Sequence, residues 1–213
     1  MKIKLLKAFL IMLLSPCLVL AGNQKSRLDI LVNALVVCPP LDHKRGRRGA
    51  PTRFVDNGDG TICDHGTGLM WEMKNGEDGI EDLNNPRDLD NNYSWTSLAD
   101  GDDTNPDGTA FTDFLARLNG EVASSLASEQ LGGHSDWRLP TSAELQTILD
   151  CSLGLPPCIV DPIFDPTAAA AHWSSTSIAT LPNFAWHVDF GNGIVMGFNK
   201  GVGFRVRAVR GGR

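Results

Sequence analysis

The chain has 213 residues, 42% of them hydrophobic and 21% charged, and its formal net charge is −6 at pH 7. A chain of this length is typical of one domain with a leader. The acidic total argues against nucleic acid as a partner, because proteins that bind nucleic acids present a basic surface to the phosphates.

Residues 1–21 have the pattern of a signal peptide. Three lysines precede an apolar run at residues 8–20, and Val19 and Ala21 supply the small residues that a signal peptidase recognises. The run is short for a membrane span and Pro16 interrupts it, which favours cleavage over anchoring. We therefore expect an exported protein, in the periplasm, at the cell surface or outside the cell, with no transmembrane segment after cleavage.

Cleavage would leave 16 basic residues (19 less three lysines) against 25 acidic ones, a net charge of −9. Residues 22–50 lack a sustained hydrophobic period and end in a Gly/Arg-rich stretch. We expect a tether here, with a short strand at ILVNALVV (30–37). The domain proper is predicted over residues 51–213.

Export bears on the cysteines, because oxidising compartments favour disulfide bonds. Loss of Cys17 with the leader leaves four cysteines. Cys151 and Cys158 flank the turn-rich loop SLGLPP, which can bring two Cα atoms within disulfide range, and Cys38 with Cys63 follows by elimination. A zinc site is the competing hypothesis, but the four cysteines lack C-x-x-C spacing.

The domain begins with a predicted β-meander in RFVDNGDGTICDHGTGLMWE (53–72). Short strands at 53–56 and 61–63 are joined by NGDG, a strong hairpin signal, and a second turn leads to LMW at 69–71. The DNGDG segment resembles a calcium-binding loop only superficially, because its acids do not alternate over the length that an EF-hand requires.

Residues 74–108 form a predicted surface insertion rich in Asn, Asp and Gly. Ten acids face one base, Arg87, over residues 77–107. Oxygen-bearing side chains near the end of this segment could chelate Ca²⁺. A solvated acidic loop is the preferred interpretation, because the ligand motif is incomplete. The candidate ligands are Asp100, Asp102, Asp103, Asn105 and Asp107.

Two main helices are predicted. FTDFLARLNG spaces four apolar residues at i, i+3, i+4 and i+7 and then reaches Asn119-Gly120, which predicts a helix over 110–119. Thr141 and Glu144 have the spacing of a capping box, which predicts a second helix over 142–150.

The segment before the second helix, Asp136-Trp137-Arg138-Leu139, is predicted to be an extended corner that anchors the core. Alternation sends Trp137 inward and sends Asp136 and Arg138 outward, where we expect these two opposite charges to pair. A catalytic Asp–Arg pair is the less favoured alternative. His134, Ser135 and Asp136 do not form a triad, because adjacent residues cannot converge on one substrate atom in the required order. The corner comprises Asp136, Trp137, Arg138, Thr141 and Glu144.

The last third of the chain is predicted to be β-structure. AHWSSTS (171–177), the hairpin FAWHVDFGNGIVMGF (184–198) and GFRVRAVR (203–210) have strand patterns, with His187 and Asp189 on the outward face. The basic residues near the end could bind sulfate or carboxylate groups. Ordinary surface charges paired with nearby acids are the alternative. The candidate polyanion-binding residues are Lys200, Arg205, Arg207 and Arg210, together with Arg45, Arg47 and Arg48.

Six segments resemble, in this order, the C-terminal domain family of the Legionella collagen-like (Lcl) adhesin: RFVDNGDGTICDHGTGLMWE, FTDFLARLN, GGHSDWRLPTSAELQTILD, HWSSTS, AWHVDF and FRVRAVR. The resemblance covers residues 53–210, and DWRLPTSAEL is its most specific part. It implies an exported bacterial domain. The named member resembles an oligomeric adhesin that binds sulfated glycosaminoglycans, but this ligand does not transfer automatically.

A more distant similarity concerns the fold. RLPTSAEL and the closing GFRVRAVR are similar to signatures of formylglycine-generating (sulfatase-modifying) enzymes, which have a C-type-lectin-like fold. This similarity implies an α+β domain with twisted antiparallel sheets and paired terminal strands, with Arg53–Val55 beside Phe204–Val209. The enzymatic reaction needs a cysteine pair late in the domain, and no cysteine follows Cys158, so we expect no such activity.

We favour a non-enzymatic ligand-binding or adhesion domain that recognises envelope or extracellular glycans, or an envelope protein. One alternative is a structural or homo-oligomerisation module of the cell envelope without a small ligand. Another is an enzyme that acts on envelope polymers. The acidity of residues 77–107 weighs against a polyanion and suggests a cationic ligand, Ca²⁺ or a protein partner. We expect no other cofactor.

Overall fold

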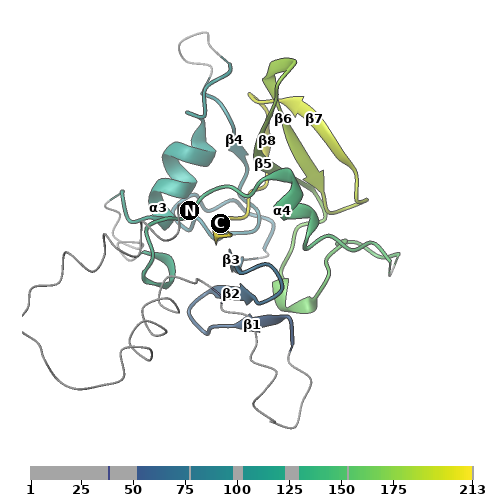
Figure 1. Cartoon of the computed structure of the whole chain (residues 1–213). Coiled ribbons are helices and arrows are strands. Elements are labelled where there is room, and N and C mark those ends of the chain that lie inside the picture. The colour runs from purple at the N-terminus through teal and green to yellow at the C-terminus, as the bar shows by residue number, and fades with distance from the viewer. Residues whose placement is uncertain are drawn as a thin grey trace, which may run out of the picture. The chain divides into compact units, whose positions relative to one another are not determined.

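A computed structural model describes Cys38 and residues 52–76, 78–97, 103–122, 130–152 and 154–212. Most strands lie in three antiparallel sheets of four, three and two strands, and short helices lie between them (Figure 1). This mixture agrees with the predicted α+β class. The expected signal peptide and most of the expected tether lie outside the described residues.

The four-stranded sheet contains the predicted meander. Its hairpin turn forms as expected, with Gly60 at φ 85° and the carboxylate of Asp59 accepting hydrogen bonds from the N–H and hydroxyl of Thr61. Strands β2 and β3 are buried along their whole length. The strand order is β1 (Phe54–Asp56), β2 (Thr61–Asp64), β3 (Leu69–Glu72) and β9 (Val209–Gly211).

The predicted pairing of Arg53–Val55 with Phe204–Val209 is wrong. β9 pairs with β3, with Trp71 opposite Val209, so that β1 and β9 form the two opposite edges of the sheet. The reason lies in burial. β3 is buried along its whole length and has a partner strand on both sides, whereas two of the three β1 residues are exposed.

The three-stranded sheet contains the predicted C-terminal hairpin. β6 (Leu181–Asp189) pairs with β5 (Ala171–Ile178) on one side and with β7 (Val195–Asn199) on the other. The prediction that His187 faces outward is wrong. Its side chain is 4% exposed and lies 4.9 Å, ring to ring, from Phe204. The face that carries His187 packs onto the aromatic interior.

The predicted strand over residues 203–210 is divided in the structure. Gly203 and Phe204 form β8, which pairs with β4 (Tyr93–Ser94), and residues 205–208 then cross to the other sheet before β9 begins. Arg205 makes a bridge to His172 at the edge of β5. Because the strand alternation is interrupted here, Arg207 points into the interior rather than outward.

Both predicted helical positions are helical, but with different lengths. The first contains a π-helical stretch, η1 (Ala110–Leu115), followed by α3 (Ala116–Leu118). The second, α4 (Ser142–Gln146), ends four residues before the predicted boundary. Leu149 bridges Ile159 instead of continuing the helix, because the chain turns back between Cys151 and Cys158. The remaining helical turns are η2 (Leu131–Gly133) and η3 (Pro162–Phe164).

The prediction that residues 74–108 lie at the surface is wrong for part of this segment. Leu89, Tyr93 and Trp95 are 6%, 1% and 4% exposed, and Tyr93 and Trp95 belong to the core cluster that also contains Trp137 and Trp173. The indole N–H of Trp95 donates to the carbonyl of Ser174 over 3.0 Å. The acidic segment is therefore anchored by aromatic side chains. In the described part of the chain, we find no helix long and apolar enough to cross a membrane.

Candidate functional site

Trp137 anchors the corner as predicted. Its side chain is 3% exposed, and its indole N–H donates to the carbonyl of Leu131 over 3.0 Å. Asn119 holds the backbone of the same residue, because its amide accepts from the N–H of Trp137 and donates to the carbonyl. The residue that ends the first helix therefore also fixes the corner, a link that the sequence pattern did not indicate.

The predicted pairing of Asp136 with Arg138 is wrong. The guanidinium of Arg138 makes two hydrogen bonds to the carboxylate of Glu144, at 2.7 and 2.8 Å, and a third to the carbonyl of Gly211. Asp136 pairs with Arg210 of β9 at 2.6 Å. The two residues of the corner therefore have partners in different elements, Glu144 in α4 and Arg210 in β9.

The capping box of α4 is confirmed and connects to this ion pair. The hydroxyl of Thr141 accepts from the N–H of Glu144, and the Glu144 carboxylate accepts from the N–H of Thr141. Burial acts to raise the pKa of Glu144, but the hydrogen bonds from Arg138 and Thr141 outweigh it and hold this pKa below its ordinary value. Asp136 likewise has a lowered pKa, mainly because of its hydrogen bond with Arg210.

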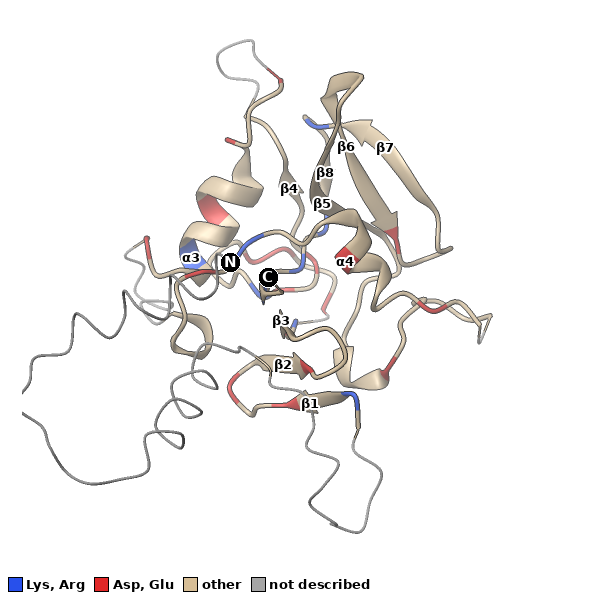
Figure 2. Cartoon of the chain, viewed as in Figure 1, with Lys and Arg blue, Asp and Glu red and all other residues tan. Residues whose placement is uncertain are grey.

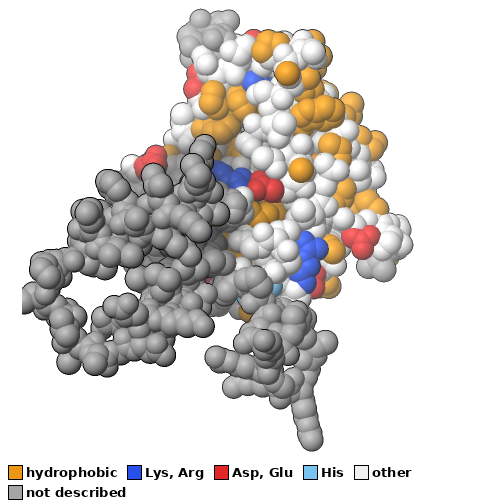
Figure 3. Space-filling view, viewed as in Figure 1, with side chains coloured by type: hydrophobic (Ala, Val, Ile, Leu, Met, Phe, Trp, Pro, Cys, Tyr) orange, Lys and Arg blue, Asp and Glu red, His pale blue; other side chains and the backbone are white. Residues whose placement is uncertain are grey.

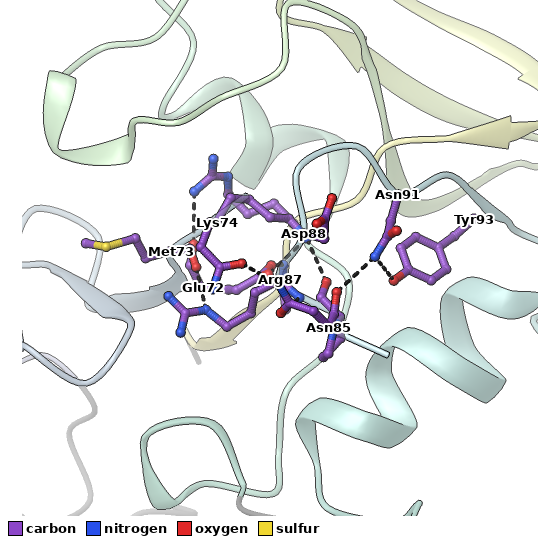
Figure 4. A network of polar contacts seen from close by, with 12 residues as sticks. Glu72, Met73, Lys74, Asn85, Arg87, Asp88, Asn91 and Tyr93 are labelled. Atoms are coloured by element: carbon purple, nitrogen blue, oxygen red, sulfur yellow. Dashed lines mark hydrogen bonds and ion pairs between the residues drawn. The ribbon is translucent and has the colours of Figure 1, made fainter. Parts of the chain in front are cut away.

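A second polar group lies in the interior beside β3 (Figure 4). Glu72 is fully buried, and Lys74 Nζ lies 2.9 Å from its Oε1 atom. Glu72 Oε2 accepts from the N–H of Ala208, and Arg207 donates to the carbonyl of Glu72. The other guanidinium nitrogen of Arg207 donates to the hydroxyl of Thr167 over 2.9 Å. These contacts satisfy charges that would otherwise be costly to bury.

Burial dominates the electrostatics of this interior group. It lowers the pKa of Lys74 and lowers that of Arg207 to about 10, with Glu72 acting in the opposite direction on both. The imidazole of His172 is 1% exposed, and burial lowers its pKa to about 3. His172 Nδ1 lies 2.9 Å from the carbonyl of Ala170, so this nitrogen carries the proton of the neutral ring.

The neighbouring acidic segment is held by the same region. Arg87 donates to the carbonyl of Met73 over 2.7 Å, and Asn91 donates to the hydroxyl of Tyr93 over 3.0 Å (Figure 4). Burial is the main cause that raises the pKa of Tyr93. These contacts fix the position of the loop.

The four cations predicted to bind a polyanion do not form one open patch. Lys200 and Arg207 are each 1% exposed, and Lys200 donates to the carbonyl of Thr104 and lies over the ring of Trp95 at 3.9 Å. Arg205 contacts Asp90, and Arg210 is paired with Asp136. Basic residues in the described part of the chain are spread over several elements (Figure 2). The additional candidates Arg45, Arg47 and Arg48 lie outside the described residues.

The predicted calcium ligands are only partly described. Asp100 and Asp102 lie outside the described residues. Asp107 accepts a hydrogen bond from the N–H of Ser97 over 2.8 Å, and this contact lowers its pKa and shapes the loop. Among the described residues, we find no group of three or more acidic, histidine or cysteine side chains that could hold a metal ion.

The surface of the three-stranded sheet has one apolar feature that the sequence pattern did not assign to solvent. Ile194, Met196 and Phe198 are 51%, 47% and 41% exposed, and we call these three side chains the β7 row. Hydrophobic side chains gather over this part of the molecule (Figure 3). The alternation along the strand was visible in the sequence, but the burial of the face depends on which segments pack over it.

Both predicted disulfides are present. Cys38 pairs with Cys63 and Cys151 pairs with Cys158, with Cα–Cα distances of 5.5 and 4.4 Å. Cys38 and Cys158 are buried, whereas Cys151 is exposed. The short spacing of the second pair and the even cysteine count were sufficient signals for these bonds.

Comparison with protein families gives one match. Residues 60–210 match the family described as the Lcl C-terminal domain, a range that runs from the first hairpin turn to β9. The search of curated proteins found no match. Because the matched range covers well over half of the chain, the chain belongs to the Lcl C-terminal domain family.

Proposed function

We propose that the protein is an exported binding domain of the bacterial cell envelope that recognises a glycan and has no catalytic activity. Membership of the Lcl C-terminal domain family suggests an envelope-associated domain. The two disulfides are compatible with export. The relationship to the C-type-lectin-like fold is part of this proposal, although the terminal strands do not pair with each other.

The observation that carries the proposal is that the charged side chains at the corner and beside β3 are paired with opposite charges. Arg138 is held by Glu144, Asp136 by Arg210, and Lys74 by Glu72. A general acid or base must reach its substrate, whereas these groups brace the scaffold. Binding is then left to the outer surface of a rigid domain, as expected of a recognition module.

The location of the cations bears on the ligand class. A sulfated polymer needs accessible arginine or lysine side chains, but Lys200 and Arg207 are internal and Arg205 and Arg210 contact acids. We therefore propose a glycan with little or no negative charge. Calcium bound by the acidic segment is a separate hypothesis that the same experiment addresses.

The experiment is a glycan array probed with the purified whole chain, at low and high salt and with and without EDTA. Binding to uncharged glycans that neither salt nor EDTA abolishes supports the proposal. Preference for sulfated glycans that is lost at high salt contradicts the ligand class, because it indicates counterion release from a cationic site. The heat-denatured chain is the control for adsorption.

Two further outcomes are informative. Binding that EDTA abolishes assigns a role to a bound cation. Absence of binding to every glycan contradicts glycan recognition and favours the structural or assembly role. The open edge of β7 is the specific observation in favour of that second function.

A further inference from the structure

Strand β7 is the open edge of the three-stranded sheet. The strand order is β5–β6–β7, so β7 has a partner on one side only (Figure 1). The opposite edge is covered, because Arg205 donates its N–H to Ala171 of β5 over 3.1 Å and accepts from the N–H of Trp173 over 2.9 Å. Within the described residues, no bridge covers the outer side of β7.

The register identifies which backbone groups are open. Asp189 donates to Ile194 and Lys200 donates to Asn183, so both contacts belong to the same antiparallel register in which Ala185 lies opposite Phe198. In such a ladder, alternate residues direct both backbone groups to the same neighbour. The even-numbered residues of β7 therefore bond to β6, and the backbone groups of Val195 and Gly197 and the N–H of Asn199 remain open at the edge. The carbonyl of Asn199 already accepts from the N–H of Val202 over 3.2 Å.

The side chains along this edge are apolar and uncharged. The β7 row presents three partly exposed hydrophobic side chains on one face. The segment from Phe190 to Asn199 contains no charged residue and no proline. Soluble proteins usually protect an exposed edge with such residues or with a bulge. An unprotected edge of this kind is a template for a further strand.

We propose that β7 joins two copies of the chain, which pair antiparallel about a two-fold axis at Gly197 and form a continuous six-stranded sheet. Centring the pairing on Gly197 gives the longest overlap and places the open N–H of Asn199 in each copy opposite the open carbonyl of Val195 in the other. On the face of the β7 row, Met196 of each copy then lies opposite Phe198 of the other, a sulfur–aromatic contact.

Charge favours a second copy at this place. The chain has a net charge of −6, so two copies repel each other overall. The segment 190–199 avoids this repulsion because it is uncharged. A two-fold pairing is also closed, since it uses the open edge of both copies and leaves no edge on which a third strand could add.

The first test is cross-linking of the whole chain with both native disulfides formed. In the proposed register the Cα atoms of residues 196 and 198 from different copies lie about 4.5 Å apart, which is within disulfide range. A mixture of Met196→Cys and Phe198→Cys chains is therefore expected to form mixed disulfide dimers under mild oxidation. Each variant alone is expected to cross-link far more slowly, because its two cysteines are offset along the strand.

The second test is the mass in solution by sedimentation velocity over a range of concentrations. The native chain is expected at twice the mass of one chain, and Met196→Lys at the mass of one chain, because a lysine there protects the edge. Ile80→Lys is the matched control, since Ile80 is 69% exposed and lies outside the sheet. This control is expected to keep the dimer mass.

The outcomes separate clearly. The proposal is overturned if the native chain has the mass of one chain at every concentration, if Met196→Lys keeps the native mass, or if mixed and single cysteine variants cross-link equally. Circular dichroism checks that Met196→Lys is folded, and the cross-linking result stands without that variant. Because the tests measure association alone, they do not depend on the glycan proposal.

Discussion

Glu72 is fully buried and contacts two cations in the interior, Lys74 through its carboxylate and Arg207 through its main-chain carbonyl. This group stabilises the fold only while its ion pairs and hydrogen bonds are intact, because each unpaired ion in the interior is costly. The same enclosure acts on His172, which stays neutral because the buried ring cannot gain solvation for a positive charge. At this scale, burial and pairing set the charge states of the interior side chains.

Replacing Glu72 with Gln is expected to destabilise the fold strongly. The change leaves Lys74 and Arg207 without their shared counter-charge, and breaking a buried ion pair typically costs about 3–5 kcal/mol. The measurement is the free energy of unfolding in urea. Glu121→Gln is the control, since Glu121 is exposed and its substitution should change stability by less than about 0.5 kcal/mol. Equal stability of the two variants would contradict the role of Glu72.

Acid should weaken the fold through His172. The unfolded chain takes up a proton below the ordinary pKa of 6.5, whereas folded His172 stays neutral down to a pKa of about 3. Its contribution to stability is therefore complete above pH 6.5 and falls as the pH decreases, by about 2 kcal/mol between pH 7 and pH 5. Urea unfolding at both pH values, in the native chain and in His172→Gln, measures this. An unchanged pH dependence in the variant would exclude His172 as the cause.

At the scale of elements, α4 is a very short helix. It has five residues, yet its N-terminus joins the corner, β9 and its own capping box through Arg138 and Glu144. A helix this short has little intrinsic stability. Its geometry is therefore imposed by the ion pair and by the buried side chain of Leu145.

Thr141→Ala should remove the cap and destabilise the domain by about 1 kcal/mol, because the N–H of Glu144 loses its acceptor. Thr141→Ser keeps the hydroxyl and should remain close to the native chain. Urea unfolding of both variants measures the difference. A serine variant as unstable as the alanine variant would show that the methyl group, and not the hydrogen bond, matters.

Local signals were predicted correctly from the sequence. The NGDG turn, the T-x-x-E cap and the close spacing of Cys151 and Cys158 each specify a structure within a few residues. The resemblance to the Lcl C-terminal domain family was also correct. Short-range geometry and a family pattern are therefore accessible without coordinates.

The errors share one cause, which is that the partner lies far along the chain. Asp136 pairs with Arg210 rather than Arg138, β9 pairs with β3 rather than β1, and Arg207 turns inward to contact Glu72 and Thr167. Alternation predicts opposite faces but does not say which face is covered. The candidate polyanion site was inferred from the basic residues near the end of the chain. Tertiary packing buries two of them and places the other two against acids.

At the scale of the whole molecule, the described core divides into two apolar clusters, and the disulfides lie at different depths. Cys38 and Cys63 belong to the cluster that contains Trp137 and Trp173. The Cys151–Cys158 bond instead closes a short surface loop beside α4. The first bond connects the start of the described chain to the core, and the second shapes a single turn.

A mild reductant should therefore open the two bonds in a fixed order. Cys151 is exposed, whereas Cys38 is 0% exposed, and exchange requires access of the attacking thiolate to sulfur. We expect Cys151–Cys158 to be reduced first in the folded protein. Alkylation after short treatment with dithiothreitol, followed by peptide mass spectrometry, gives the order. Simultaneous reduction of both bonds under native conditions would contradict the depth of the first.

The Cys38–Cys63 bond also determines where mechanical load enters the domain. Cys63 belongs to β2, which has β1 on one side and β3 on the other. Force applied to the chain before Cys38 is therefore transmitted through the disulfide to β2 and not through the outer strand β1. β2 is hydrogen-bonded to a strand on each side. Tension from the N-terminal direction must shear two rows of hydrogen bonds at once instead of unzipping one.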